Sequence, residues 1–322
     1  MRVRALLQTA LDGPRSLRIR EVEMPVAGAS VLIDVHVAGI GFPDLLFAHG
    51  AYQDLIEPPF VPGYEVAGTI RSAPRACGFE PGTRVLGFTM RGGHAEVAAA
   101  DPSLTLVLPD ELSDEEAIRL GTNYQTAHLA LVRRARAQAG ETAVVFGAGG
   151  GLGNAVVDLA SALGLEVVAV ASSEEKRSLA LAAGASYALA PGEGLAGAVR
   201  ELLPRRADLV LDPVGGALTT ATRLLAPGGR LVLLGFASGE IESVPANQLL
   251  VRNADAIGVV WGSSVEREPA LASEIWGELL CLHAEGRLRP PQGPTFPLEQ
   301  APQVLEQIAA RRLVGKAVLR VR

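Results

Sequence analysis

A cluster of five glycines between Gly147 and Gly153 is the part of this chain whose residue types and spacing most clearly suggest chemistry. Gly147, Gly150 and Gly153 follow the spacing G-x-x-G-x-x-G, whereas the more familiar G-x-G-x-x-G would need a glycine at Leu152. Glycine lets the backbone approach a pyrophosphate closely, and a helix N-terminus offers that anion unpaired N–H groups and a positive dipole end. The cluster predicts a dinucleotide pyrophosphate site, with a flexible loop as the alternative; the residues that would form it are Gly147, Gly150, Gly151, Leu152 and Gly153.

The segments on either side of the cluster favour the first of these interpretations. The apolar run Ala143–Phe146 has the length of a buried strand, and Leu152–Leu163 is an apolar segment long enough for three helical turns. A second β-branched run, Glu166–Ala171, follows. Strand, glycine turn, helix and strand make the first βαβ unit of a dinucleotide-binding sheet.

The residues after the second strand indicate which nucleotide binds. NAD sites place an acidic residue about 20 residues beyond the turn, where it accepts from the ribose 2′-OH, whereas NADP sites offer a cation to the 2′-phosphate. This chain has Ser172 and Ser173 there, followed by Lys176. A solvated helix residue is the alternative for Lys176, but it is one of only two lysines in the chain. The pattern therefore predicts NADPH, held by these three side chains.

Length and composition exclude several classes of protein. A chain of 322 residues is long for one core and predicts two domains. A net charge of −6, without a basic run, argues against a nucleic-acid partner. Two cysteines are too few for a disulfide framework or a structural zinc site, and every apolar run is shorter than a membrane span. We therefore expect a cytoplasmic protein with neither nucleic-acid nor membrane partners.

The rest of the chain divides into a β-rich part and a part in which strands and helices alternate. Short strands separated by Gly and Pro turns fill residues 3–100 and predict a compact barrel or rolled sheet. Strand and helix patterns then alternate, and they predict six strands, the last at Ala256–Val260. Six strands are enough for a doubly wound parallel sheet. The final strand pattern, Lys316–Val321, is expected to return to the β-rich part.

Segments spread along the whole chain resemble one protein family. They include Ala38–Leu46 (AGIGFPDLL), Phe60–Ile70 (FVPGYEVAGTI), Gly92–Val97 (GGHAEV), Asn123–Leu131 (NYQTAHLAL), Asp212–Gly216 (DPVGG), Pro227–Gly239 (PGGRLVLLGFASG) and Arg311–Leu319 (RRLVGKAVL). In this order they resemble the zinc-free quinone oxidoreductases of the medium-chain dehydrogenase/reductase superfamily, the group that includes zeta-crystallin. The resemblance implies an α/β fold with a GroES-like, β-rich catalytic domain, residues 1–120 and 264–322. It also implies a Rossmann NADP-binding domain with a six-stranded, doubly wound parallel sheet, residues 121–263.

The resemblance further implies that the protein binds no metal. Zinc-dependent relatives carry Gly-His-Glu, with a histidine ligand, where this chain has Gly63, Tyr64 and Glu65. They also carry a cysteine ligand in the segment that corresponds to Ala38–Asp44, which has none here. The five histidines show no metal-like spacing, and a catalytic zinc needs about three protein ligands. We therefore predict a zinc-independent enzyme.

Two residues of the segment that lines the active cleft in the family are retained here, and they are our catalytic candidates. The segment corresponds to Gly41–Tyr52, and it keeps Asp44 and Tyr52. Tyr52 either donates a hydrogen bond to a substrate oxygen or packs at a turn, and Asp44 is expected to brace the loop. Gly41 stands where the family usually has Asn, so a polar side chain is missing from the cleft.

The resemblance places five further residues at the nicotinamide end of the nucleotide. Thr126 corresponds to a threonine that approaches the nicotinamide, and the backbone of Gly235, Phe236 and Ala237 meets it after a strand. Trp261 belongs to a segment that serves both the cleft and the subunit edge. Core packing is the alternative for Phe236 and Trp261.

These features together predict an enzyme that transfers hydride from NADPH to a quinone or an α,β-unsaturated carbonyl. Without a metal, nothing strongly stabilises an alkoxide, whereas a conjugated oxygen delocalises the charge that hydride brings. The alternatives are a non-catalytic NADPH-binding protein, structural or redox-sensing, and an enoyl-thioester reductase. Family members are commonly dimers, and the apolar run Ala256–Val260 predicts an edge strand that pairs with a second copy.

Overall fold

The computed structural model describes residues 1–53 and 55–322 and divides into two compact units. The first unit comprises residues 1–122, 264–276 and 292–322, and the second comprises residues 123–263 and 277–291. Among the residues described, no helix is both long and apolar enough to cross a membrane.

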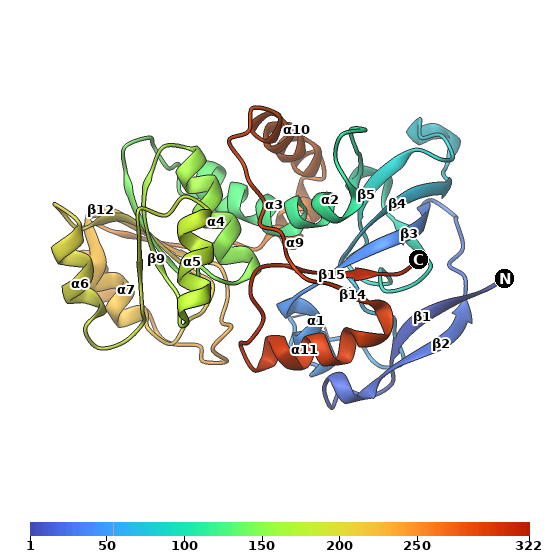
Figure 1. Ribbon diagram of the computed structural model, residues 1–322, viewed down its shortest axis with the longest axis horizontal. Helices are drawn as coiled ribbons and strands as arrows, with labels where there is room; N and C mark the ends of the chain where they lie inside the picture. Colours follow the sequence, from blue (N-terminus) through green and yellow to red (C-terminus); the bar gives the residue numbers. More distant parts are fainter. Residues whose placement is uncertain (54) are drawn as a thin grey trace. The chain divides into compact units, whose positions relative to one another are not determined.

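The second unit is built on a sheet of six parallel strands in the order β10-β9-β8-β11-β12-β13 (Figure 1). The strands are β8 (Thr142–Phe146), β9 (Glu166–Val170), β10 (Tyr187–Leu189), β11 (Ala207–Asp212), β12 (Leu225–Leu233) and β13 (Asp255–Gly258). The order runs outward from β8 in both directions, as in a doubly wound sheet that binds ligands at its carboxyl edge. This confirms the expected Rossmann sheet.

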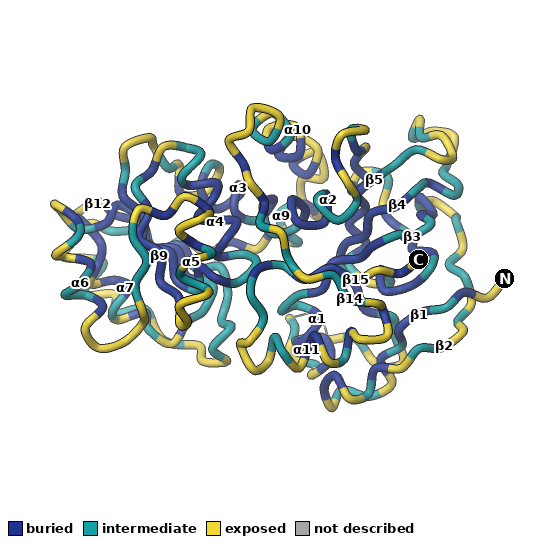
Figure 2. Tube along the Cα trace, viewed as in Figure 1, coloured by how far each residue is buried: buried dark blue, intermediate teal, exposed yellow. Residues whose placement is uncertain are grey.

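Helices cover both faces of this sheet, which explains the continuous apolar strands. The helices are α4 (Gly151–Ala162), α5 (Glu174–Ala182), α6 (Leu195–Leu202), α7 (Leu218–Leu224) and α8 (Ala246–Leu250). Strand residues with even numbers, such as Val144 and Val168, pack in one core with Leu195 and Val199 of α6. Successive strand residues point to opposite faces, so β8 is buried along its whole length, and the strands around the label β9 in Figure 2 are mostly dark blue.

The first unit is β-rich, as the punctuated strand patterns predict. Strands β14-β15-β3-β4-β5-β7 form one sheet, β6 pairs with β3, and β1 and β2 form a separate antiparallel ribbon. Their bounds are β1 (Arg2–Gln8), β2 (Leu17–Glu23), β3 (Val31–Ile40), β4 (Glu65–Ser72), β5 (Arg84–Phe88), β6 (Val97–Ala100), β7 (Thr105–Val107), β14 (Thr295–Pro297) and β15 (Ala317–Arg320). The C-terminal β15 pairs with β3, which confirms that the end of the chain returns to this part.

Short helices complete the first unit. They are α1 (Phe42–Ala48), α2 (Asp114–Leu120) and α11 (Ala301–Ala309), with 3-10 helices at Pro14–Ser16, Arg75–Cys77, Pro102–Leu104 and Leu298–Gln300. Ser113 is the N-cap of α2, because its hydroxyl accepts a hydrogen bond from Glu116 N at 3.2 Å.

The remaining helices lie where the chain passes between the units. They are α3 (Thr122–His128), which continues as a π-helical turn (Leu129–Arg134), α9 (Trp261–Arg267) and α10 (Ala270–Ala284). The expected boundaries assigned residues 277–291 to the β-rich domain, but these residues lie in the second unit. His128 Nε2 lies 2.8 Å from Glu278 Oε2, and Arg289 N donates to Asp158 at 3.0 Å. Such contacts join partners far apart in sequence, which strand and helix patterns do not reveal.

Candidate functional site

The glycine cluster forms a tight turn between β8 and α4. Gly147 has φ +60°, a left-handed conformation that favours glycine, and its carbonyl accepts a hydrogen bond from Gly150 N at 2.9 Å. A Cβ built on Gly153 would lie 2.2 Å from the same carbonyl oxygen. Gly153 is therefore needed for the first turn of α4 to pack against the end of the strand, as the motif predicts.

Lys176 packs directly on this turn. A Cβ built on Gly149 would lie 2.3 Å from the Lys176 Cβ and 3.0 Å from its Cα, so glycine at 149 allows the N-terminal turn of α5 to approach. Ser173 is the N-cap of α5, and its hydroxyl accepts from Lys176 N at 3.3 Å. Ser172 and Ser173 are both exposed. The structure thus brings the predicted cation and the two serines to the predicted phosphate turn.

The turn fits a pyrophosphate on the evidence of its own atoms. Residues 151–153 are the first turn of α4, where backbone N–H groups have no acceptor within the helix. A Cβ on Gly150 would meet only the Gly147 carbonyl, at 3.5 Å. The cradle therefore offers both donors and free space to a diphosphate.

The carboxyl ends of β11 and β12 lie at the same edge of the sheet. Ala237 N donates to Pro213 O at 3.2 Å, and the Phe236 ring would lie 3.0 Å from a Cβ on Gly215. The loops after β11 and β12 therefore support each other. Gly235, Phe236 and Ala237 are half-buried, and the Phe236 ring packs beside Gly215. The contact of these three residues with a nicotinamide stays a prediction.

Asp212, at the end of β11 and the first residue of the DPVGG segment, is a buried residue of this edge for which no role was predicted. Its Oδ1 accepts from Val214 N at 2.8 Å and from Gly215 N at 3.0 Å, and its Oδ2 is buried without a partner among the described residues. Burial raises the pKa of Asp212, although the two N–H groups oppose this. In the sequence, an acidic residue at the end of a strand of the predicted parallel sheet was the feature that could have pointed to Asp212.

Thr126 and Trp261 belong to one cluster in the second unit. Trp261 is 3% exposed, and its Nε1 donates to Gln125 Oε1 at 3.3 Å. Gln125 is fully buried beside the half-buried Thr126 on α3. These are the contacts of a packing residue, and a contact between Trp261 and a nucleotide stays a prediction.

The catalytic candidates of the first unit occupy one segment around α1. Asp44 is buried, and its Oδ2 accepts from Gly41 N at 2.9 Å, the bracing contact that we expected. The Tyr52 ring packs on Phe47 with ring centres 4.2 Å apart, and its hydroxyl shares a hydrogen bond with Tyr64. Tyr52 therefore packs at the turn and also places a hydroxyl beside a second one.

Tyr64 stands where the zinc-dependent relatives carry a histidine ligand. Burial, together with the neighbouring Tyr52, Glu266 and Glu65, raises the pKa of Tyr64 far above its ordinary value. Its hydroxyl therefore keeps its proton at every physiological pH. The neutral Tyr64 phenol can take part in hydrogen bonds but supplies no negative ligand to a metal.

Lys316 and Glu65 form a buried ion pair close to Gly41, and this pair was not predicted. Lys316 Nζ lies 2.7 Å from Glu65 Oε1, and Thr122 donates to Oε2 from its backbone N at 2.7 Å and its hydroxyl at 2.8 Å. A Cβ on Gly39 or Gly121 would lie within 2.3 Å of the carboxylate, so both glycines make room for it. The feature of the sequence that could have pointed to Lys316 is that it is one of only two lysines in the chain.

The histidines serve separate structural partners. His36 lies 2.7 Å from an Asp114 carboxylate oxygen, His94 lies 2.9 Å from the Gly39 carbonyl, and His128 contacts Glu278. No cluster of three or more His, Cys, Asp or Glu side chains that could hold a metal occurs in the part of the chain that the structure describes.

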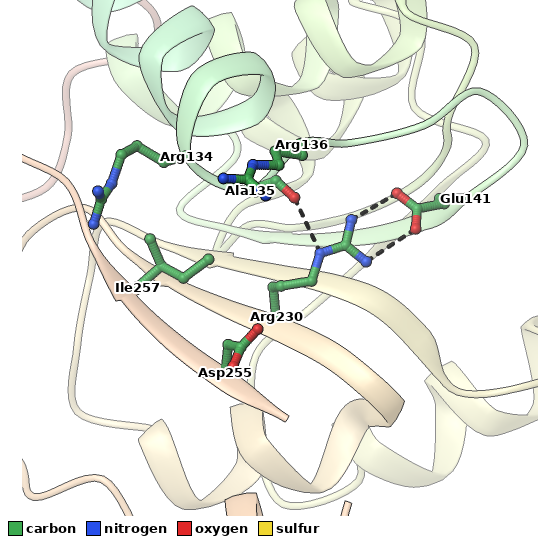
Figure 3. Close-up of a pocket in the computed structure, with 7 residues that line it drawn as sticks. All are labelled: Arg134, Ala135, Arg136, Glu141, Arg230, Asp255 and Ile257. Atoms are coloured by element: carbon green, nitrogen blue, oxygen red, sulfur yellow. Dashed lines mark hydrogen bonds and ion pairs between the residues drawn. The ribbon is translucent and has the colours of Figure 1, made fainter. Parts of the chain in front are cut away.

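A hollow of about 480 Å³ lies at the opposite edge of the sheet, at the amino ends of β12 and β13 (Figure 3). It is lined by Arg134, Ala135, Arg136, Glu141, Arg230, Asp255 and Ile257. Arg230 donates two hydrogen bonds to the Glu141 carboxylate, at 2.9 and 2.7 Å, which fixes one wall. Since the glycine turn follows the carboxyl end of β8, this hollow is not the nucleotide site.

Comparisons with known proteins agree with this arrangement. Residues 27–110 match the alcohol dehydrogenase GroES-like domain, and residues 151–276 match the zinc-binding dehydrogenase domain. The chain is 37% identical to quinone oxidoreductase-like protein 2 of Bos taurus over 95% of this chain and 89% of that protein.

Two solved structures share the fold over nearly their whole length. A probable oxidoreductase from Mycobacterium abscessus is 39% identical, with a TM-score of 0.91 over 100% of this chain and 99% of that one. The quinone oxidoreductase of Thermus thermophilus, solved also in complex with NADPH, is 36% identical, with a TM-score of 0.87 over 99% of this chain and 100% of that one. The chain therefore belongs to the quinone oxidoreductase family of the medium-chain dehydrogenase/reductase superfamily.

Proposed function

We propose that this protein is an NADPH-dependent, zinc-independent oxidoreductase that reduces a quinone or an α,β-unsaturated carbonyl. The observation that carries the proposal is the contact of Lys176 Cα and Cβ with Gly149, because a lysine side chain that starts at the glycine turn supports the choice of a phosphorylated nucleotide. Membership of the quinone oxidoreductase family and the NADPH complex of the Thermus thermophilus relative support the same cofactor.

The residues of the chain have separate roles in this proposal. NADPH, when bound, supplies a hydride ion. The N–H groups of residues 151–153 hold its pyrophosphate, and Lys176 with Ser172 and Ser173 selects the 2′-phosphate. Thr126 and the backbone of residues 235–237 orient the nicotinamide.

Substrate reduction then needs little from the protein beyond positioning and hydrogen bonds. A quinone or enone accepts hydride at an electron-poor carbon, and the negative charge moves to its conjugated oxygen. Tyr64 carries a protonated hydroxyl that shares a hydrogen bond with Tyr52, so this pair can donate one hydrogen bond to that oxygen, and water can supply the final proton. This chemistry proceeds without a metal to stabilise an alkoxide.

The proposal is tested by mixing the protein with NADPH and either 1,4-benzoquinone or 2-cyclohexenone and following the loss of NADPH absorbance. We expect turnover of at least one of them. Calorimetry on the same preparation measures NADPH binding separately. Binding without turnover of any quinone or enone would favour a non-catalytic NADPH-binding protein, and the absence of binding by folded protein would overturn the proposal.

Independence from zinc has its own test. Prolonged dialysis against EDTA should leave NADPH oxidation unchanged, because the His position of the zinc-dependent relatives is Tyr64, a protonated phenol. Loss of activity that zinc restores would contradict this part of the proposal.

A further inference from the structure

Lys316 is held in a buried pair, and among the described residues Glu65 is the one side chain that its ammonium group is paired with. Its side chain is 11% exposed and the Glu65 side chain 2%, and Nζ lies 2.7 Å from Glu65 Oε1. The other carboxylate oxygen is occupied by the two donors of Thr122. An ammonium group has three N–H donors, and Glu65 uses one of them. Lys316 is fixed in place and can still donate.

Gly41 leaves room beside this ammonium group without any need to be glycine. Its backbone is extended, with φ −162°, a conformation that any residue adopts. A Cβ at this position would meet only Pro43 Cδ at 3.6 Å and Lys316 Nζ at 3.8 Å, which are ordinary contact distances. By contrast, a Cβ on Gly39 would lie 2.3 Å from Glu65 Oε1. The missing side chain at position 41 therefore creates space next to Lys316.

This space belongs to the segment that carries the other candidate donors. Gly41 precedes α1, and Asp44, which accepts from Gly41 N, fixes its backbone. The Glu65 carboxylate balances the charge of Lys316, so a neutral oxygen acceptor suits the space. A fixed cation also stabilises negative charge that develops on that oxygen during a reaction.

We propose that the space beside Gly41 receives the carbonyl oxygen of the substrate and that Lys316 donates a hydrogen bond to it. The inference rests on the proposed function and names a substrate-binding residue for it. Hydride adds to the electron-poor carbon, the conjugated electron pair moves onto the oxygen, and Lys316 holds the resulting oxyanion while keeping its own proton. A solvent proton then completes the reduced product as NADP⁺ leaves.

The test uses 4-nitrophenolate, an oxyanion whose visible absorbance reports hydrogen bonding, as a probe of the bound oxyanion at a pH where the phenol is ionised. Lys316→Met removes the donor, and Gly41→Val fills the space while both members of the ion pair stay in the chain. We expect each to weaken nitrophenolate binding, and to lower kcat/KM for 1,4-benzoquinone, by about 10- to 100-fold, the effect of one charged hydrogen bond. The dissociation constant for NADPH should stay unchanged.

Matched controls separate this role from a structural one. Arg71→Met breaks another ion pair of the same unit, in which Arg71 Nη2 lies 2.6 Å from Asp34. Gly194→Val substitutes the N-cap of α6, as Gly41→Val does for α1, at a position with open space. Both controls should bind nitrophenolate as the wild type does.

Two results would overturn the inference. One is wild-type nitrophenolate affinity in folded Gly41→Val, and the other is an equal loss in the two control variants. Nitrophenolate binding needs no turnover. A wild type that binds the probe through Lys316 but oxidises no NADPH would therefore overturn the proposed function alone.

Discussion

Lys176 rests against the backbone of Gly149, and this contact predicts what its loss will do. We expect Lys176→Ala to raise the dissociation constant for NADPH by about 10- to 100-fold, because one charged hydrogen bond to the 2′-phosphate is lost. NADH has no such phosphate, so its binding should change little. Calorimetry with both nucleotides measures this. Arg200→Ala, which removes an exposed cation from α6, is the control. Equal effects of Lys176→Ala on the binding of the two nucleotides would show that Lys176 is a surface charge with no contact to the 2′-phosphate.

Asp158 is buried on α4, and its Oδ2 accepts hydrogen bonds from Tyr124 Oη at 2.6 Å and Arg289 N at 3.0 Å. Burial raises the pKa of Asp158 from its ordinary value of 3.8, although these two donors oppose the change. A group whose folded pKa is raised stabilises the fold below its unfolded pKa, and this contribution is lost as pH rises through the folded pKa.

The variant Asp158→Asn keeps the shape of this side chain and has no such titration. Its free energy of unfolding, relative to the wild type, should therefore increase from about pH 4 upward and level off above the folded pKa. Urea unfolding of both proteins across this range measures the difference. A difference that is constant with pH would show that Asp158 has the same pKa in both states.

The turn between β8 and α4 is the element on which nucleotide binding depends. Gly153→Ala places a Cβ 2.2 Å from the Gly147 carbonyl oxygen, so the turn must shift. We expect the free energy of unfolding to fall by about 1–3 kcal/mol, as in other overpacked sites, and NADPH binding to weaken with it. Thermal unfolding with and without NADPH tests both effects.

Gly197 on α6 is the matched control for this substitution. A Cβ at Gly197 would meet no atom within 4 Å, and the residue lies in a helix as Gly153 does. Gly197→Ala should stabilise the protein by about 0.5–1 kcal/mol, the difference in helix propensity. If both variants behaved alike, the close approach at Gly153 would not be what requires glycine.

The whole molecule is expected to be a homodimer formed through the edge strand β13. In the sheet order, β13 pairs with β12 alone, and Ala256 is exposed and Ile257 half-buried. An apolar edge strand pairs readily with a second copy. We expect light scattering to give the mass of two chains, and Ile257→Lys to give the mass of one. Leu181→Lys, at an exposed apolar residue of α5, should leave the mass unchanged, and a monomeric wild type would contradict the prediction.

Local patterns were sufficient to predict much of this molecule. The six strands of the second unit follow from short, mostly apolar runs, and the glycine turn follows from spacing, because its geometry is made by consecutive residues. The N-cap at Ser113 was predictable for the same reason. Each of these features depends on neighbours within a few positions, whose interactions are the same in any fold that contains them.

Contacts between distant parts of the chain were decided only by the tertiary structure. The pair of Glu65 and Lys316 and the place of residues 277–291 in the second unit both join segments far apart in sequence. The residue types alone do not specify such partners, because a buried charge requires some partner but its identity depends on which segments the fold packs together. The sequence determined the glycine turn, and packing determined which side chains lie beside Gly41 and Lys316.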